Sequence, residues 1–262
     1  MTKQAKILVS LACIILVAVI IQLSFFLYSQ HQVKNINRQE AYAQGVTQQI
    51  DQYYVDQETG FIIEDMNEED LVNIRSHLND LEESEALGPK QIQAYNDLHR
   101  RYFARDEVNA MYVEPVITGG HVNSNVPYVE NIDYYTLLET VDPYRFQETE
   151  DYFQETINLL IDDALTQTLN YETAITTLNN LKFIPVTDGY FEVIARGVKE
   201  AEEAYALVYN QTLLTKLNDA FQSYARELIE EINTSNIDVA NHQELQSAME
   251  ISPYLKRLFV GE

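Results

Sequence analysis

The stretch NEEDLVNIRSHLNDL, residues 67–81, contains both the start and the buried face of a helix. Asn67 followed by Asp70 resembles a capping box, in which the two residues satisfy backbone N–H groups at the start of a helix. Apolar residues then recur every third or fourth position, which places them on one face. They are Leu71, Ile74, Leu78 and Leu81. We therefore expect an amphipathic helix that packs against other helices.

The same spacing continues on both sides of this stretch. Ala43, Val46, Ile50 and Tyr53 share one face of a helix that precedes it. Gly88-Pro89 ends the central helix and begins the next, because proline suits the first helical position. Apolar residues with helical spacing then run from Ile92 towards Tyr112. Short connections between the three helices predict an antiparallel three-helix bundle over residues 39–113.

Residues 114–142 break the helical spacing. The stretch EPVITGGHVNSNVPYVENIDYY, residues 114–135, contains two prolines and two adjacent glycines. Such residues mark turns and loops. We predict a connector over residues 114–142, with extended segments at 113–118 and 126–129.

A second helical bundle is predicted over residues 143–233. Asp142 and Pro143 suit the cap and the first position of a helix, and four sets of apolar residues with helical spacing follow. Residues 234–262 form a predicted C-terminal tail with short helices. No apolar stripe sustains three heptads, which favours intramolecular bundles over a coiled coil. The predicted fold class is all-α, with a single N-terminal transmembrane helix followed by two helical-bundle modules.

The transmembrane prediction rests on the run ILVSLACIILVAVIIQLSFFLY, residues 7–28, which contains no charged residue. Twenty-two helical residues span about 33 Å, the thickness of a bilayer core. The run ends in bulky residues rather than in the small residues of a cleavage site, so we expect a retained anchor. Lys3 and Lys6 precede it. Their charge favours a short cytoplasmic tail, residues 1–6, and an ectodomain outside the cell membrane.

The charge of the chain excludes one class of partner. The protein has 17 Lys and Arg residues against 41 Asp and Glu residues, a net charge of −24. Residues 1–28 contain two of the lysines and none of the acids, so residues 29–262 carry 15 basic and 41 acidic residues, a net charge of −26. A nucleic-acid-binding surface needs clustered basic residues. We therefore expect no nucleic-acid partner.

No motif of a catalytic site, a metal site or a cofactor site is present in the sequence. The histidines do not pair at the i, i+4 spacing of a helical zinc site, and the adjacent acids resemble a solvated surface more than a pair of catalytic carboxylates. We expect no catalytic residue, no metal and no cofactor. Candidate binding residues lie in and beside the connector, where aromatic rings could stack on sugars and a loop histidine could form a polar site. They are Tyr112, His121, Tyr128, Tyr134 and Tyr135. The alternative is that these tyrosines fill the ends of the bundles and that His121 lies in a plain turn.

Two stretches resemble a known family. IDQYYVDQETGFIIEDMNEEDLVNIRSHLNDL, residues 50–81, is similar to the opening of the extracellular region of MapZ-type cell-division site-positioning proteins of Gram-positive bacteria. YVEPVITGGHVNSNV, residues 112–126, looks like the connector that follows in that family. The resemblance covers residues 40–233 and implies a helical extracellular pedestal. It departs from the family in the short segment before the anchor and in lacking the family's C-terminal peptidoglycan-binding subdomain. We therefore do not transfer the family's wall-binding residues or its contacts with division proteins.

These observations predict a non-enzymatic, single-pass membrane protein. Its helical ectodomain would act as a spacer or interaction module at the membrane–cell-wall interface, in cell division or envelope organisation. The expected partners are the membrane, through residues 7–28, envelope or division proteins, and peptidoglycan by weak contact. The first alternative is an extracytoplasmic module that binds or senses a ligand or peptide. The second is a cell-wall hydrolase, which would need two converging carboxylates in a cleft.

Overall fold

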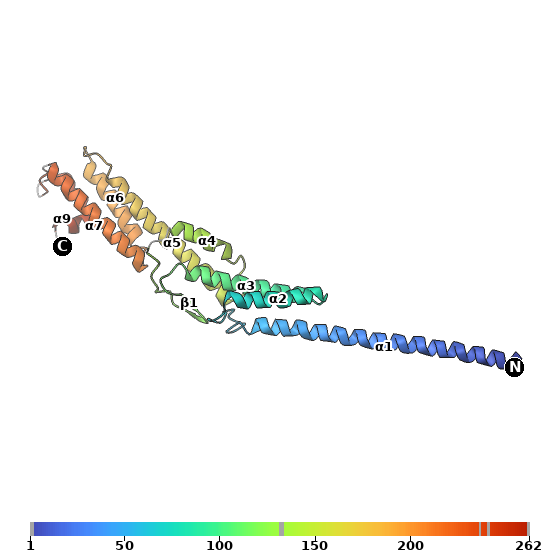
Figure 1. Cartoon of the computed structure of the whole chain (residues 1–262). Coiled ribbons are helices and arrows are strands. Elements are labelled where there is room, and N and C mark those ends of the chain that lie inside the picture. The colour runs from blue at the N-terminus through green and yellow to red at the C-terminus, as the bar shows by residue number, and fades with distance from the viewer. Residues whose placement is uncertain (1–2, 131–133, 236, 240–241, 261–262) are drawn as a thin grey trace. The chain divides into compact units, whose positions relative to one another are not determined.

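The computed structural model describes residues 3–130, 134–235, 237–239 and 242–260, with the side chains of residues 3–19 and Tyr134 left out. The described chain is mostly helical, which confirms the predicted all-α class (Figure 1). Its elements, in chain order, are α1 (Lys3–Asp51), α2 (Glu68–Glu83), α3 (Pro89–Asn109), β1 (Ile117–Thr118), β2 (His121–Val122), α4 (Tyr134–Val141), the short 3₁₀ helix η1 (Asp142–Tyr144), α5 (Tyr152–Leu181), α6 (Tyr190–Tyr205), α7 (Gln211–Thr234), α8 (Gln243–Ile251) and α9 (Pro253–Val260).

The chain divides into two compact units. The first consists of residues 1–54 and 65–99, and the second of residues 55–64 and 100–262. Helix α3 contributes its residues up to His99 to the first unit and the rest to the second.

The first unit has its core where α1 packs on α2. The predicted apolar face of α2 is buried along its whole length, from Leu71 to Leu81. The predicted capping box is also present. The side chain of Asn67 accepts hydrogen bonds from the N–H groups of Glu69 and Asp70, and the Asp70 carboxylate accepts one from the N–H of Asn67 at 2.9 Å. Here the local sequence pattern and the packed structure agree.

Helix α1 is a single helix of 49 residues. The predicted anchor, residues 7–28, lies for the most part among residues 1–19, whose side chains are outside the described part of the structure. A search of the described residues identifies no helix with the length and hydropathy of a membrane span. Residues 20–28 are all exposed, so removing the chain before Ser29 takes away no side chain that is described as buried.

The second unit has one large apolar core shared by α5, α6, α7, α8 and α9 (Figure 1). The first two of the four predicted sets of apolar residues lie on the single helix α5, apart from Phe146, which precedes it. Pro143 lies in a helix, but this helix is the three-residue η1, which begins at Asp142 and has Val141 rather than Asp142 at its cap position. The side chain of Asn158 explains the break that follows, because it binds both the N–H (2.8 Å) and the C=O (2.7 Å) of Phe146 and holds that residue outside any helix.

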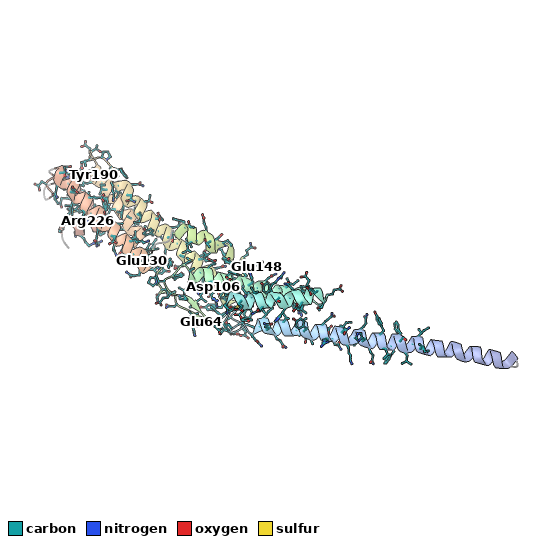
Figure 2. All side chains as sticks on the ribbon, in the orientation of Figure 1. Glu64, Asp106, Glu130, Glu148, Tyr190 and Arg226 are labelled. Atoms are coloured by element: carbon teal, nitrogen blue, oxygen red, sulfur yellow. The ribbon has the colours of Figure 1, made fainter. Side chains whose placement is uncertain are left out.

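The connector is packed rather than loose. β1 and β2 pair as an antiparallel hairpin, and Tyr112 forms a further bridge with Tyr128. Val116, Ile117 and Val126 are buried in the core of the second unit. Of the two expected extended segments, residues 113–118 contain β1 and residues 126–129 contain the bridging residue Tyr128, and the expected connector also contains a helix, α4. Elsewhere the surface is strongly acidic, with exposed side chains such as Glu130 and Glu148 projecting into solvent (Figure 2).

Candidate functional site

Two of the five candidate binding residues, Tyr112 and Tyr128, form a ring pair inside the core. Their ring centroids lie 5.0 Å apart, and their exposed fractions are 6% and 1%. Burial raises the pKa of both hydroxyls well above the usual value near 10, and the charge of Asp163 raises both further. Both tyrosines are therefore protonated at neutral pH. Their faces pack against protein and are not open to a sugar ring.

A buried polar network holds the backbone of this pair in place. The Asn210 side chain accepts hydrogen bonds from the N–H of Tyr128 at 3.2 Å and from the N–H of Thr212, and it donates to the C=O of Val126. The Thr212 hydroxyl donates to the C=O of Tyr128 at 2.6 Å. The side-chain oxygen of Gln167 accepts from the N–H of Asn210 at 2.7 Å. Buried polar groups must be paired to be tolerated, and here they pair mainly with backbone of the connector.

Asp163 lies beside this network and faces a further tyrosine. It accepts hydrogen bonds from the Gln167 amide at 3.0 Å and from the hydroxyl of Tyr209. Partial burial, followed by the hydrogen bond to Asp163, raises the pKa of Tyr209 to about 12. Asp163 thus acts as an acceptor at the edge of a structural network.

The other three candidate residues lie on β2 and at the start of α4. His121 lies on β2 and is exposed. Tyr135 lies in the first turn of α4 with 38% of its surface exposed. The side chain of Tyr134 is outside the described part of the structure. Sequence spacing therefore identified the connector, but it did not show which of its residues are buried and which are exposed.

A second set of buried polar contacts, which we call the Arg101 clamp, holds the loop of residues 55–64. Arg101 is 4% exposed, and its guanidinium forms two hydrogen bonds with the Asp151 carboxylate, at 2.6 and 3.1 Å. The same guanidinium donates to the C=O of Gly60 at 3.0 Å. Asp151 also caps α5 by accepting from the N–H of Gln154. One arginine therefore joins the loop, α3 and the start of α5.

Gly60 is required at this clamp, and we expect Gly60→Ala to destabilise the second unit by at least about 1–3 kcal/mol. Its φ is +74°, and an added Cβ would lie 2.3 Å from Nη1 of Arg101 and 2.6 Å from the Asp151 carboxylate. The matched control is Gly45→Ala in α1, where a Cβ meets nothing within 4 Å. Gly45→Ala should stabilise its helix by about 0.5–1 kcal/mol. Urea unfolding of residues 29–262, followed by circular dichroism, measures both. Equal effects of the two substitutions would contradict this account.

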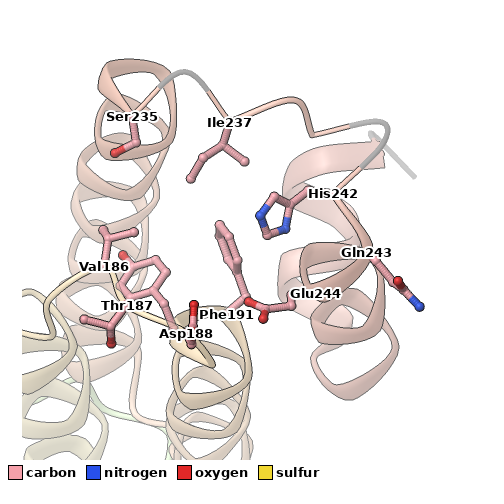
Figure 3. Close-up of a pocket in the computed structure, with 10 residues that line it drawn as sticks. Val186, Thr187, Asp188, Phe191, Ser235, Ile237, His242, Gln243 and Glu244 are labelled. Carbon is pink, nitrogen blue, oxygen red and sulfur yellow. The ribbon is translucent and has the colours of Figure 1, made fainter.

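A cavity of about 510 Å³ lies at the end of the second unit where the α5–α6 loop, the end of α7 and the start of α8 meet (Figure 3). We call it the α6–α8 cavity. Its lining comes from residues 186–188, 190–191, 235, 237 and 242–244. The rings of Phe191 and His242 meet edge to face with centroids 5.0 Å apart, and Nδ1 of His242 accepts from the N–H of Leu245. The Tyr190 hydroxyl donates to Glu231 at 2.7 Å.

Sequence reasoning did not identify this cavity, the buried network around Asn210 or the contact between Arg101 and Asp151. The apolar spacing of α6 and α7 does predict which residues face inward, but no local signal shows that three helix ends leave a hollow between them. The described residues contain no group of three His, Cys, Asp or Glu side chains arranged to hold a metal ion.

Comparisons with known proteins agree with the resemblance found in the sequence. Residues 28–163 match the family described as MapZ extracellular domain 1. Searches of the curated proteins and of the solved structures each found no match. The match indicates an extracytoplasmic, division-related module, and it includes both the loop held by Arg101 and the connector. Because the matched segment covers more than half of the 262 residues, the chain belongs to the MapZ extracellular domain 1 family.

Proposed function

We propose that this chain is a non-enzymatic, membrane-anchored protein whose helical ectodomain acts as a spacer and interaction module at the membrane–cell-wall interface during division. In this proposal residues 7–28 span the membrane and residues 1–6 are cytoplasmic. The family membership supports the extracellular position and the link to division.

The observation that carries the proposal is that buried polar side chains bind the backbone of irregular segments. Arg101, Gln167 and Asn210 are 4%, 1% and 8% exposed, and each binds backbone groups of an irregular segment. Such contacts hold these irregular segments in fixed positions. A spacer requires fixed positions of this kind, because a flexible segment would not keep a set distance between its ends.

Helix α1 supports the spacer role by its length. It continues for 23 residues beyond Tyr28, to Asp51, which corresponds to about 35 Å of helix. Its first side-chain hydrogen bond to α2 or to the turn after it comes from Gln39, which donates to the C=O of Ser84 at 2.7 Å. A continuous helix transmits position better than a flexible linker because its length is fixed.

The test of this proposal uses the full chain with a C-terminal tag in a Gram-positive host. We expect the chain to remain in carbonate-washed membranes and the tag to be removed by protease added to intact cells. Leu16→Arg combined with Val19→Arg is the control and should not insert. Each charge at the centre of a span raises the free energy of membrane insertion by about 2.5–3.5 kcal/mol. Soluble wild-type protein, or a tag that resists external protease, would overturn the membrane arrangement.

The enzymatic part is tested separately. Purified chain incubated with insoluble peptidoglycan should release no muropeptides into the supernatant. Release of muropeptides would overturn the non-enzymatic function.

A second candidate function, a ligand- or peptide-binding module, is favoured by the α6–α8 cavity. Its volume falls within the range of small-molecule and peptide pockets, about 300–1,000 Å³. This cavity lies outside the segment that matches the family, residues 28–163.

A further inference from the structure

The rim of the α6–α8 cavity exposes apolar groups to solvent. Val186, on the loop between α5 and α6, is 43% exposed. Val186 lines the cavity, as do Phe191 and Ile237 (Figure 3). Exposed apolar residues that line a cavity are typical of contact surfaces, because their burial by a partner removes apolar area from water. These residues form a surface for a partner with an apolar side chain.

The carboxylates that line the α6–α8 cavity give it a negative charge. Asp188 and Glu244 line it, and neither forms an ion pair among the described residues. None of the ten lining residues is a lysine or an arginine. A neighbouring cavity of about 330 Å³ shares Gln243 and Glu244 and adds Glu192. The charge of Glu192 is already balanced by an ion pair with Arg196. The two remaining carboxylates therefore define a site that is complementary to a cation and repels an anion.

We propose that the α6–α8 cavity binds a short basic peptide segment in which a lysine or arginine lies beside an apolar residue. The cationic group contacts Asp188 and Glu244, and the apolar residue contacts Val186 and Ile237. A volume of about 510 Å³ holds a few side chains. This inference rests on the proposed interaction function and deepens it by naming the chemistry of the partner.

The test measures peptide binding to the full chain in dodecyl maltoside micelles by isothermal titration calorimetry. The probe is acetyl-Leu-Lys-Leu-Lys-amide, and the matched peptides replace both lysines with glutamine or with glutamate. We expect the lysine peptide to bind about tenfold more tightly than the glutamine peptide, below the limit of about 25-fold that two exposed ion pairs of up to about fivefold each can give. Added salt should weaken binding because exposed charges are screened. No measurable binding of the lysine peptide, or equal binding of the three peptides, overturns the proposal.

Matched variants locate the binding to the cavity. Asp188→Asn combined with Glu244→Gln removes both free carboxylates and should weaken lysine-peptide binding by about tenfold. Glu148→Gln combined with Glu200→Gln changes the net charge equally at exposed positions outside the cavity and should leave binding within twofold. Val186→Lys, at an exposed position, should abolish binding without unfolding the chain. Equal weakening by both double variants would show a general charge effect and overturn the assigned site. Because membrane localisation and muropeptide release are separate measurements, failure here is distinguishable from failure of the proposed function.

Discussion

Replacing Arg101 with methionine is expected to destabilise the second unit by about 3–5 kcal/mol, because removing one partner of a buried ion pair leaves the other charge uncompensated. The side chains of Arg101 and Asp151 are 5% and 12% exposed. The substitution also removes the hydrogen bond to the C=O of Gly60 and the packing of the guanidinium over the Phe153 ring, 5.4 Å from its centroid. Urea unfolding of residues 29–262, followed by far-ultraviolet circular dichroism, measures the loss.

The matched control is Arg196→Met. Arg196 also pairs with a carboxylate, that of Glu192, but the two side chains are 73% and 57% exposed. Exposed pairs contribute little because water and salt screen them, so this loss should stay below about 0.5 kcal/mol. If Arg101→Met costs no more than Arg196→Met, the clamp does not hold the loop of residues 55–64 and the rigid-spacer argument loses its main support.

The second large expected effect is a steep loss of stability above about pH 10. Burial raises the pKa of four tyrosines above the value of about 10 that they have in the unfolded chain. They are Tyr112, Tyr128, Tyr190 and Tyr224. A raised folded-state pKa means that the protonated form is the stabilised one. The stability is therefore fully present below pH 10 and is lost as the pH rises from 10 towards the folded-state pKa. Each of the four lowers the free energy of unfolding by about 1.4 kcal/mol per pH unit in that range.

We expect tyrosinate absorbance and loss of helical circular dichroism to rise together in one cooperative transition during alkaline titration of residues 29–262. Tyr224→Phe should move this transition to higher pH. It removes one titrating group whose hydroxyl is buried and has no hydrogen-bond partner among the described residues. Tyr152→Phe, at a position 55% exposed, should leave the transition unchanged. Ionisation of all tyrosines near pH 10 with the helices intact would show that the hydroxyls are not buried.

The helices of this protein are largely determined by local sequence. Asn67 and Asp70 form a capping box, and the apolar residues from Leu71 to Leu81 are all buried, as their spacing predicts. Helix periodicity depends on residues three or four positions apart, so no knowledge of distant segments is needed. Local periodicity does not predict where a helix stops when a side chain farther along the chain sets the boundary. Asn158 does this by binding the backbone of Phe146.

The connector shows the limit of local reasoning. Its prolines and glycines predicted an irregular segment, and the structure contains one. The prediction that Tyr112 and Tyr128 are binding residues remains untested, but the structure packs them against each other in the core. The decisive partner, Asn210, lies 82 residues from Tyr128 along the chain. No pattern near either residue indicates that they meet.

The sequence alone therefore determined the all-α class, the faces of the helices and the family resemblance, because each depends on the order of neighbouring residues. Tertiary structure alone decided the burial of Arg101 against Asp151 and the α6–α8 cavity. An arginine and an aspartate 50 residues apart form a clamp only when the chain brings them within hydrogen-bonding distance. A cavity exists only where three helix ends meet without filling the space between them. Both depend on packing between segments distant in sequence, which local periodicity does not encode.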